Sequence, residues 1–170
     1  ELQAMRPWFA AWRLSEKAWE ARKILTYWGM EEAFSRMAAR EAKPCTGLEK
    51  ASVLLDRLKD ASRDPDEQLR TLAGTLQSEK GLATEFETLR RAWRAGDEAA
   101  LTALFRGAAP ADSPLQEDMM TGRNRAWVKR IDRSPRDFQK ALVLPGIGHL
   151  PGPDGMAAGL RAKGWTVTRM

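Results

Sequence analysis

The fold is predicted from the stretch of sequence at residues 140–169, KALVLPGIGHLPGPDGMAAGLRAKGWTVTR. The apolar segment at 140–144 is typical of a buried strand, and the alternation at 165–169 is typical of a half-buried strand. Between them lie a loop rich in glycine and proline at 145–154 and a helical segment at 155–162. Since a strand, a helix and a second strand make the crossover unit of a sheet, the sequence predicts an α/β fold.

The rest of the chain carries mainly the apolar spacing of helices. We expect helices at about 7–28, 30–42, 50–61, 65–95, 97–107 and 115–133, and a brief strand entering a helix at 43–49. A few short strands make a poor sheet for a chain of 170 residues, so we expect partner strands to lie outside it. The sequence therefore predicts a mostly helical part of a larger mixed-sheet domain.

Composition excludes several classes of protein. Hydrophobic residues make up 43% of the chain and charged residues 30%, which is typical of a folded globular domain. The single cysteine, Cys45, excludes an internal disulfide, and the single histidine, His149, excludes metal sites that need two histidines from this chain. No apolar run reaches the roughly 18 residues that a transmembrane helix needs, so no membrane span is expected in this stretch.

The net charge of +5 does not by itself indicate a nucleic-acid partner, because 28 basic residues are interleaved with 23 acidic ones. The densest basic region is 123–136, RNRAWVKRIDRSPR. We interpret it as the solvated side of an amphipathic helix whose other side carries Trp127, Val128 and Ile131, with contact to a phosphate or an anionic surface as the alternative. No nucleic-acid partner is predicted.

The loop after the apolar segment 140–144 is the first candidate site. Ligands of α/β sheets bind at the carboxyl ends of strands, and here Gly146 and Gly148 would let the backbone approach a ligand beside His149. The alternative is a loop histidine that makes only local hydrogen bonds. The spacing lacks the lysine and hydroxyl of a phosphate-binding P-loop.

Three further residues complete the set of candidates. Glu49 follows the predicted strand at 43–49, where it would be a metal ligand or general base, or simply a carboxylate at a helix N-terminus. Arg123 and Asn124 begin a predicted helix. In a functional role the guanidinium would hold a carboxylate and the amide would orient a loop or substrate, whereas otherwise they are a cap and a surface cation.

Several segments in order along the chain resemble the TraB/GumN family, which includes pheromone-shutdown proteins and the Tiki metalloproteases. The segments are Pro7-Trp8, Gly29-Met30-Glu31, KPCTGLE at 43–49, WRAGD at 93–97, GRNRAW at 122–127, GIGHLPG at 146–152 and GWTV at 164–167. The resemblance covers essentially all of the chain, which is similar to the C-terminal part of a longer single domain. The first Gly-x-x-His motif of that domain would precede Glu1.

The resemblance implies an α/β domain in which two Gly-x-x-His motifs and an acidic residue hold a divalent metal such as Mn²⁺, Co²⁺ or Zn²⁺. By position, His149 matches the second motif, Glu49 matches the family glutamate, and Arg123 with Asn124 matches the Arg-Asn pair of a Glu-Arg-Asn motif. Gly122 stands where that motif has its glutamate, and Ser52-Val53 stands where the family usually has Glu-Gln.

The resemblance implies a metal-dependent hydrolase of the peptidase type in the full-length protein, with residues 1–170 inactive and binding metal weakly by themselves. The alternative is a non-catalytic domain that binds or sequesters a peptide or a polysaccharide-assembly partner. The two departures from the family pattern favour this alternative. The resemblance also implies an extracytoplasmic setting, in the periplasm or cell envelope, and the sequence leaves a homo-oligomer open.

Overall fold

The computed structural model describes residues 5–24, 29–61, 63–78, 81–107 and 117–169. The chain divides into two compact units. Residues 1–47 and 62–87 form the first, and residues 48–61 and 88–170 form the second.

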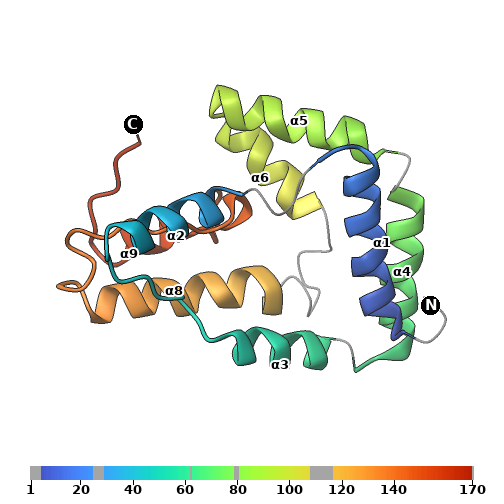
Figure 1. Ribbon diagram of the computed structural model, residues 1–170, viewed down its shortest axis with the longest axis horizontal. Helices are drawn as coiled ribbons and strands as arrows, with labels where there is room; N and C mark the ends of the chain where they lie inside the picture. The colour runs from blue at the N-terminus through green and yellow to red at the C-terminus, as the bar shows by residue number, and fades with distance from the viewer. Residues whose placement is uncertain (1–4, 25–28, 62, 79–80, 108–116, 170) are drawn as a thin grey trace. The chain divides into compact units, whose positions relative to one another are not determined.

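Two helices pack side by side in the first unit, α1 (Pro7–Ala21) and α4 (Pro65–Ser78), shown in Figure 1. Proline begins α1, where its fixed φ suits the first turn and its missing N–H is not needed. The small residues Ala10 and Ala11 are buried, and Trp19 makes an edge contact with Phe86 near the start of α5 (Leu82–Ala95), with ring centroids 5.6 Å apart. The unit also contains α2 (Met30–Arg40), in which no residue is buried.

The second unit contains α3 (Ala51–Ala61), α6 (Glu98–Gly107), α8 (Gly122–Arg133) and α9 (Met156–Ala162). A π-helical turn, η2 (Glu117–Thr121), leads directly into α8, and a 3₁₀ turn, η3 (Ile147–His149), lies between α8 and α9 along the chain. α5 ends in the left-handed Gly96, and the carboxylate of Asp97 then accepts a hydrogen bond from the backbone N–H of Ala100 to begin α6.

One face of α8 forms the core of the second unit, where Trp127, Val128 and Ile131 are buried with Met156 of α9. Helices α8 and α9 approach closely because residue 159 is a glycine: a Cβ there would lie 2.9 Å from Val128 Cγ2. The partly buried residues that pack against this core are Leu48, Phe138, Val143, Leu160 and Trp165.

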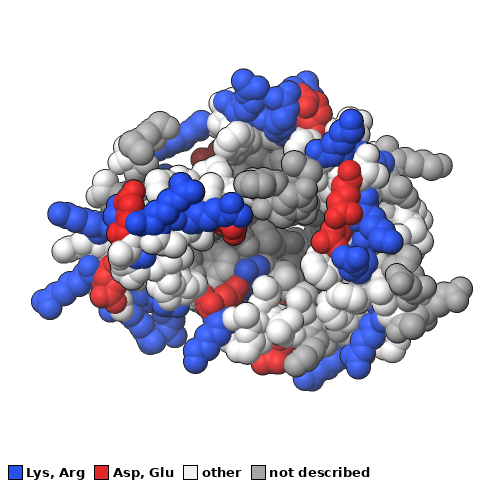
Figure 2. Space-filling model, viewed as in Figure 1, with Lys and Arg blue, Asp and Glu red and all other residues white. Residues whose placement is uncertain are grey.

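The other face of α8 is exposed and basic, which confirms the interpretation of 123–136 as an amphipathic segment. It carries Arg125, Lys129, Arg130 and Arg133. Figure 2 shows Lys and Arg side chains across the face in view, with Asp and Glu side chains among them. In the described part of the chain, no helix has the length and apolar character that crossing a bilayer would require.

The prediction of an α/β mixed-sheet fold is wrong, because the described residues form helices and no strand or sheet. The apolar segment 140–144 is buried in part through Val143, which packs on the α8 core, while Leu142 is 65% exposed. A strand also needs a neighbour to complete its hydrogen bonds, and no described segment pairs with this one. Contact with the α8 core thus involves only part of this apolar run, through Val143.

The other two predicted strands are wrong for the same reason. Residues 43–47 are exposed and do not form a strand. At 165–169 the expected alternation does occur, with Trp165 and Val167 partly buried and Thr166 and Thr168 exposed, but without a neighbouring strand. An extended backbone turns successive side chains to opposite sides whether or not it belongs to a sheet.

Most of the predicted helices are confirmed, with different ends. The predicted 65–95 is two helices, α4 and α5, and α1 ends at Ala21 rather than at residue 28. Residues 25–28, 79–80 and 115–116 of the predicted helices lie outside the described part of the chain.

Candidate functional site

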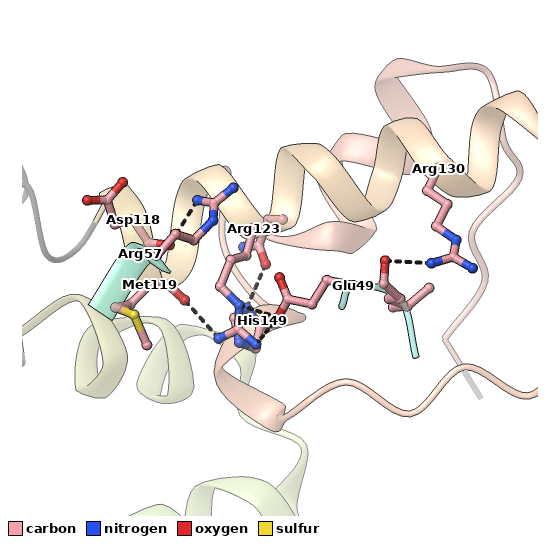
Figure 3. Close-up of polar contacts among 9 residues, drawn as sticks. Glu49, Arg57, Asp118, Met119, Arg123, Arg130 and His149 are labelled. Carbon is pink, nitrogen blue, oxygen red and sulfur yellow. Dashed lines mark hydrogen bonds and ion pairs between the residues drawn. The ribbon is translucent and has the colours of Figure 1, made fainter. Parts of the chain in front are cut away.

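The first turn of α8 brings the sequence candidates of the second unit together. Arg123 and Asn124 begin the helix, and Asn124 is buried with only 5% of its surface exposed. The turn η3 carries His149, which is 8% exposed, and Glu49 lies just before α3. Figure 3 shows Arg123, His149 and the carboxylate of Glu49 meeting beside α8.

Arg123 binds Glu49 in a part-buried ion pair. Its Nε and Nη2 lie 2.9 and 2.6 Å from the same carboxylate oxygen, Oε1, and the two side chains are 15% and 17% exposed. Its Nη1 donates to the backbone carbonyl of Met119, 3.2 Å away (Figure 3). The guanidinium is therefore engaged within the protein, and its visible role is to hold Glu49. The second oxygen of Glu49 has no hydrogen bond among the described residues.

Asn124 determines which ring nitrogen of His149 carries the proton. Its Nδ2 donates to the backbone carbonyl of Asp154 at 2.8 Å, and its Oδ1 lies 2.7 Å from His149 Nδ1. A backbone carbonyl can only accept, so the amide nitrogen must face Asp154 and the amide oxygen must face the imidazole. His149 Nδ1 therefore donates its proton to Asn124, and in the neutral ring the lone pair is on Nε2.

Trp127 lies one turn after Arg123 on α8 and contacts two groups of the site, the guanidinium of Arg123 and the imidazole of His149. The guanidinium carbon of Arg123 lies 4.7 Å from the centroid of the indole, and the imidazole centroid of His149 lies 4.6 Å from it. Sequence reasoning assigned Trp127 to the core only. The spacing of four residues from Arg123 on one helix face was the signal that could have placed it in the site.

Burial keeps His149 neutral. The pKa of the imidazole is lowered from 6.5 to about 4, chiefly by burial and also by the charge of Arg123, while Glu49 acts in the opposite direction. At neutral pH the site thus contains an uncharged imidazole whose Nε2 makes no hydrogen bond among the described residues, next to the carboxylate of Glu49 paired with a guanidinium. Such an imidazole can bind a metal ion or accept a proton.

The lowered pKa predicts a stability that depends on pH. Between pH 6.5 and about 4 the unfolded chain binds a proton at His149 and the folded chain does not, so acidification favours unfolding in this window. Each pKa unit corresponds to about 1.4 kcal/mol, and allowing for partial solvent contact we expect roughly 2 kcal/mol to be lost. Urea unfolding at several pH values measures this loss, and the imidazole resonances should titrate near pH 4.

The matched control is His149→Gln, which should flatten this part of the pH dependence without removing the hydrogen-bonding capacity of the side chain. A titration midpoint close to 6.5 in the unmodified chain would contradict the buried, neutral imidazole.

The two loop glycines have different surroundings. A Cβ on Gly148 would lie 2.8 Å from the ring of Phe105, so glycine lets the loop pack against α6. A Cβ on Gly146 would meet only His149 Cδ2 at 3.7 Å, an ordinary contact. Beside the loop lies a small cavity of about 30 Å³, lined in part by Asn124, Gly148 and Asp154.

Gly122, which departs from the family pattern, also has little space around it. A Cβ would lie 2.8 Å from the carbonyl oxygen of Glu117 and 3.0 Å from Nη1 of Arg57. Arg57 donates to the backbone carbonyl of Asp118 at 3.1 Å, which ties α3 to the π-helical turn before α8 (Figure 3). The local packing is therefore built around a glycine and does not fit the glutamate of the resembled motif.

The residues present fit only part of a metal site. His149 has the features of a ligand, because its Nδ1 is fixed by an amide oxygen and its Nε2 makes no hydrogen bond among the described residues. Glu49 adds a second donor, but nowhere in the described residues do three His, Cys, Asp or Glu side chains gather closely enough to hold a metal ion. A complete site would need further ligands.

Comparison with known proteins identifies the family. No curated protein and no solved structure matches the chain. A family model described as the TraB/PrgY/gumN family matches residues 1–169, essentially the whole chain. The chain therefore belongs to the TraB/PrgY/gumN family.

Proposed function

We propose that the chain contributes half of the active site of a metal-dependent hydrolase that acts on peptides. The observation that supports this proposal most strongly is the neutral imidazole of His149, fixed at Nδ1 by Asn124 and open at Nε2, beside the carboxylate of Glu49. Family membership does not by itself specify this activity, and the proposal rests on the chemistry of these side chains.

Each side chain has a defined task in this proposal. His149 Nε2 would hold the metal, and Asn124 holds the imidazole in the tautomer that leaves the lone pair on Nε2. Glu49 accepts a proton from the attacking water through the carboxylate oxygen that Arg123 does not bind. Bound Mn²⁺, Co²⁺ or Zn²⁺ would lower the pKa of water and polarise the scissile carbonyl.

The sequence suggested that the Arg123 guanidinium would hold a carboxylate, and the carboxylate that it binds is that of Glu49. Because the guanidinium is occupied by Glu49 and the Met119 carbonyl, its role in the proposal is to hold the general base in place. Arg123 and Asn124 are thus positioning residues in the proposed site, and Glu49 and His149 are the groups that act.

The donor set of the described residues is incomplete, so the remaining ligands must come from elsewhere. The family resemblance suggests a second Gly-x-x-His segment that precedes Glu1 in a longer product, which would supply another histidine. We accordingly propose that residues 1–170 bind metal weakly by themselves, and that the full-length protein acts outside the cytoplasm on peptide or protein substrates.

Metal-dependent thermal unfolding tests the proposal. In a longer product that carries the earlier Gly-x-x-His segment, Mn²⁺, Co²⁺ or Zn²⁺ should raise Tm, because a ligand present at 100 times its Kd stabilises the native state by about 2.7 kcal/mol. His149→Ala should abolish this rise, while Arg125→Met, in an exposed ion pair on α8, should retain it. Residues 1–170 should show little or no shift.

Peptide hydrolysis provides the second measurement. Glu49→Gln should lower kcat roughly 10²–10⁴-fold if the carboxylate is the general base, with metal binding largely retained. If the unmutated longer product neither shifts in Tm nor cleaves peptides with any of the three metals, the hydrolase proposal is wrong.

The second candidate is a non-catalytic domain that sequesters a peptide or a polysaccharide-assembly partner. The packing around Gly122 favours it, since the glutamate of the resembled motif has no room there. Under this alternative, metals leave Tm unchanged in every form of the protein, and Glu49→Gln has no effect on any activity.

A further inference from the structure

We infer that Trp127 is a positioning residue of the proposed site, which sets the spacing between the Glu49 carboxylate and the His149 imidazole. The inference rests on the proposed function in one respect, that Glu49 and His149 act together. It goes beyond that function because it assigns a role to a side chain that sequence reasoning placed only in the core.

The geometry supplies the first argument. The guanidinium carbon of Arg123 lies over the indole, 4.7 Å from its centroid, and the imidazole of His149 lies 4.6 Å away at an interplanar angle of 53°. Trp127 is 94% buried, so these contacts are protected from water. The attraction between a cation and a ring face is stronger when water is excluded. The rigid indole therefore contacts both Arg123, which holds Glu49, and His149.

The hydrogen bonds around the indole supply the second argument. Arg123 holds Glu49 through Nε and Nη2, and Asn124 holds His149 at Nδ1. These bonds hold the carboxylate through Arg123 and hold the imidazole at one nitrogen, so the tilt of the His149 ring about that bond is not fixed by them. The indole packs against both the guanidinium and the imidazole, and it thereby links the position of the carboxylate to that of the imidazole.

Simple filling of the core does not account for an indole at this position. Within the described residues, Trp127 Nε1 is buried and has no hydrogen-bond acceptor, which is unfavourable for a polar N–H group. Leu or Phe would fill an apolar core without that cost. What the indole adds is a large, flat π face that attracts the guanidinium and packs against the imidazole.

The test compares Trp127→Phe, which keeps an aromatic face, with Trp127→Leu, which does not. Trp165→Phe is the matched control, since Trp165 packs on the same core and donates to Asp132, whereas the ring that His149 contacts in the described part of the chain is that of Trp127. NMR follows two signals without metal or substrate: the exchange rate of the Arg123 Nε–H, assigned by its loss in Arg123→Lys, and the tautomer of the single histidine from long-range ¹H–¹⁵N spectra.

We expect Trp127→Leu to speed exchange at Arg123 Nε–H roughly tenfold or more, because the guanidinium becomes mobile and solvated. Its imidazole should also populate both tautomers, whereas Trp127→Phe and Trp165→Phe keep slow exchange and the Nδ1–H form. Unchanged signals in Trp127→Leu would overturn the inference. Equal changes in Trp165→Phe would overturn it as well, since they would indicate general loosening of the core.

If Trp127→Leu does not fold, Trp127→Met, which fills more of the same volume, replaces it with the same expected signals. If Trp127→Phe loses both the slow exchange at Arg123 Nε–H and the single Nδ1–H tautomer, an aromatic face is not sufficient, and this result would also overturn the inference. Since neither signal needs metal or peptide cleavage, a failure of the proposed hydrolase activity leaves this result unaffected and is recognised separately.

Discussion

Arg123→Met is expected to lower the free energy of unfolding by about 3 kcal/mol, because it leaves the Glu49 carboxylate part-buried without its partner. Both side chains of this pair are less than one-fifth exposed, at 15% and 17%. The change also removes the donor to the Met119 carbonyl and the cation over Trp127. Urea unfolding at pH 7, followed by circular dichroism, measures the loss.

Two comparisons separate this pair from an ordinary surface charge. Arg125→Met removes an arginine from the same helix, but its ion pair with Glu117 is 65% and 49% exposed, so we expect a change below about 0.5 kcal/mol. Glu49→Gln combined with Arg123→Met should recover part of the loss, because the uncompensated charge is gone. If Arg123→Met costs no more than Arg125→Met, the ion pair does not stabilise the site as described.

Asn124→Leu should have a comparable effect on stability, about 3 kcal/mol, and a larger one on the site. It removes the partner of the buried His149 Nδ1 and the donor to the Asp154 carbonyl in a part-buried hydrogen bond, and a buried group left unsatisfied costs about 1–3 kcal/mol. Loss of a partner that orients a metal-binding histidine typically weakens metal affinity about 10–100-fold. Urea unfolding and metal titration of the longer product measure the two effects.

Asn124→Asp is the informative control. A carboxylate still accepts the Nδ1 proton, so the tautomer of His149 should be retained, while the donor to Asp154 is lost and a negative charge is added. We expect the pKa of His149 to rise in this variant, since a nearby negative charge favours imidazolium. A histidine that keeps the Nδ1–H tautomer in Asn124→Leu would contradict the role that we assign to the amide.

The helices could be predicted from the sequence because their apolar spacing depends on local backbone geometry. The amphipathic pattern around Trp127, Val128 and Ile131 predicted which face of α8 is buried, and the structure confirms it. The same reasoning failed at 140–144, where an apolar run indicates burial but not the element that covers it. Here Val143 packs on helix α8, Leu142 is exposed, and no strand lies beside the segment among the described residues.

The candidate site, like the fold, could be predicted only in part from the sequence. Residue type and motif pointed to Glu49, Arg123, Asn124 and His149, and the structure places all four beside the first turn of α8 (Figure 3). Which of them bind each other could not be predicted. Sequence reasoning expected Arg123 to hold a carboxylate without identifying which one, and the fold brings it to Glu49, which is 74 residues away along the chain.

By itself the sequence determined the set of groups available for chemistry: one imidazole, no second histidine, and a basic helix with an apolar face. Only the tertiary structure decided that this imidazole is neutral, that its proton is on Nδ1 and that the Trp127 indole lies against it. The physical reason is that helix spacing repeats over a few neighbouring residues. Burial, tautomer and charge pairing instead depend on groups that are distant in sequence and meet only when the chain folds.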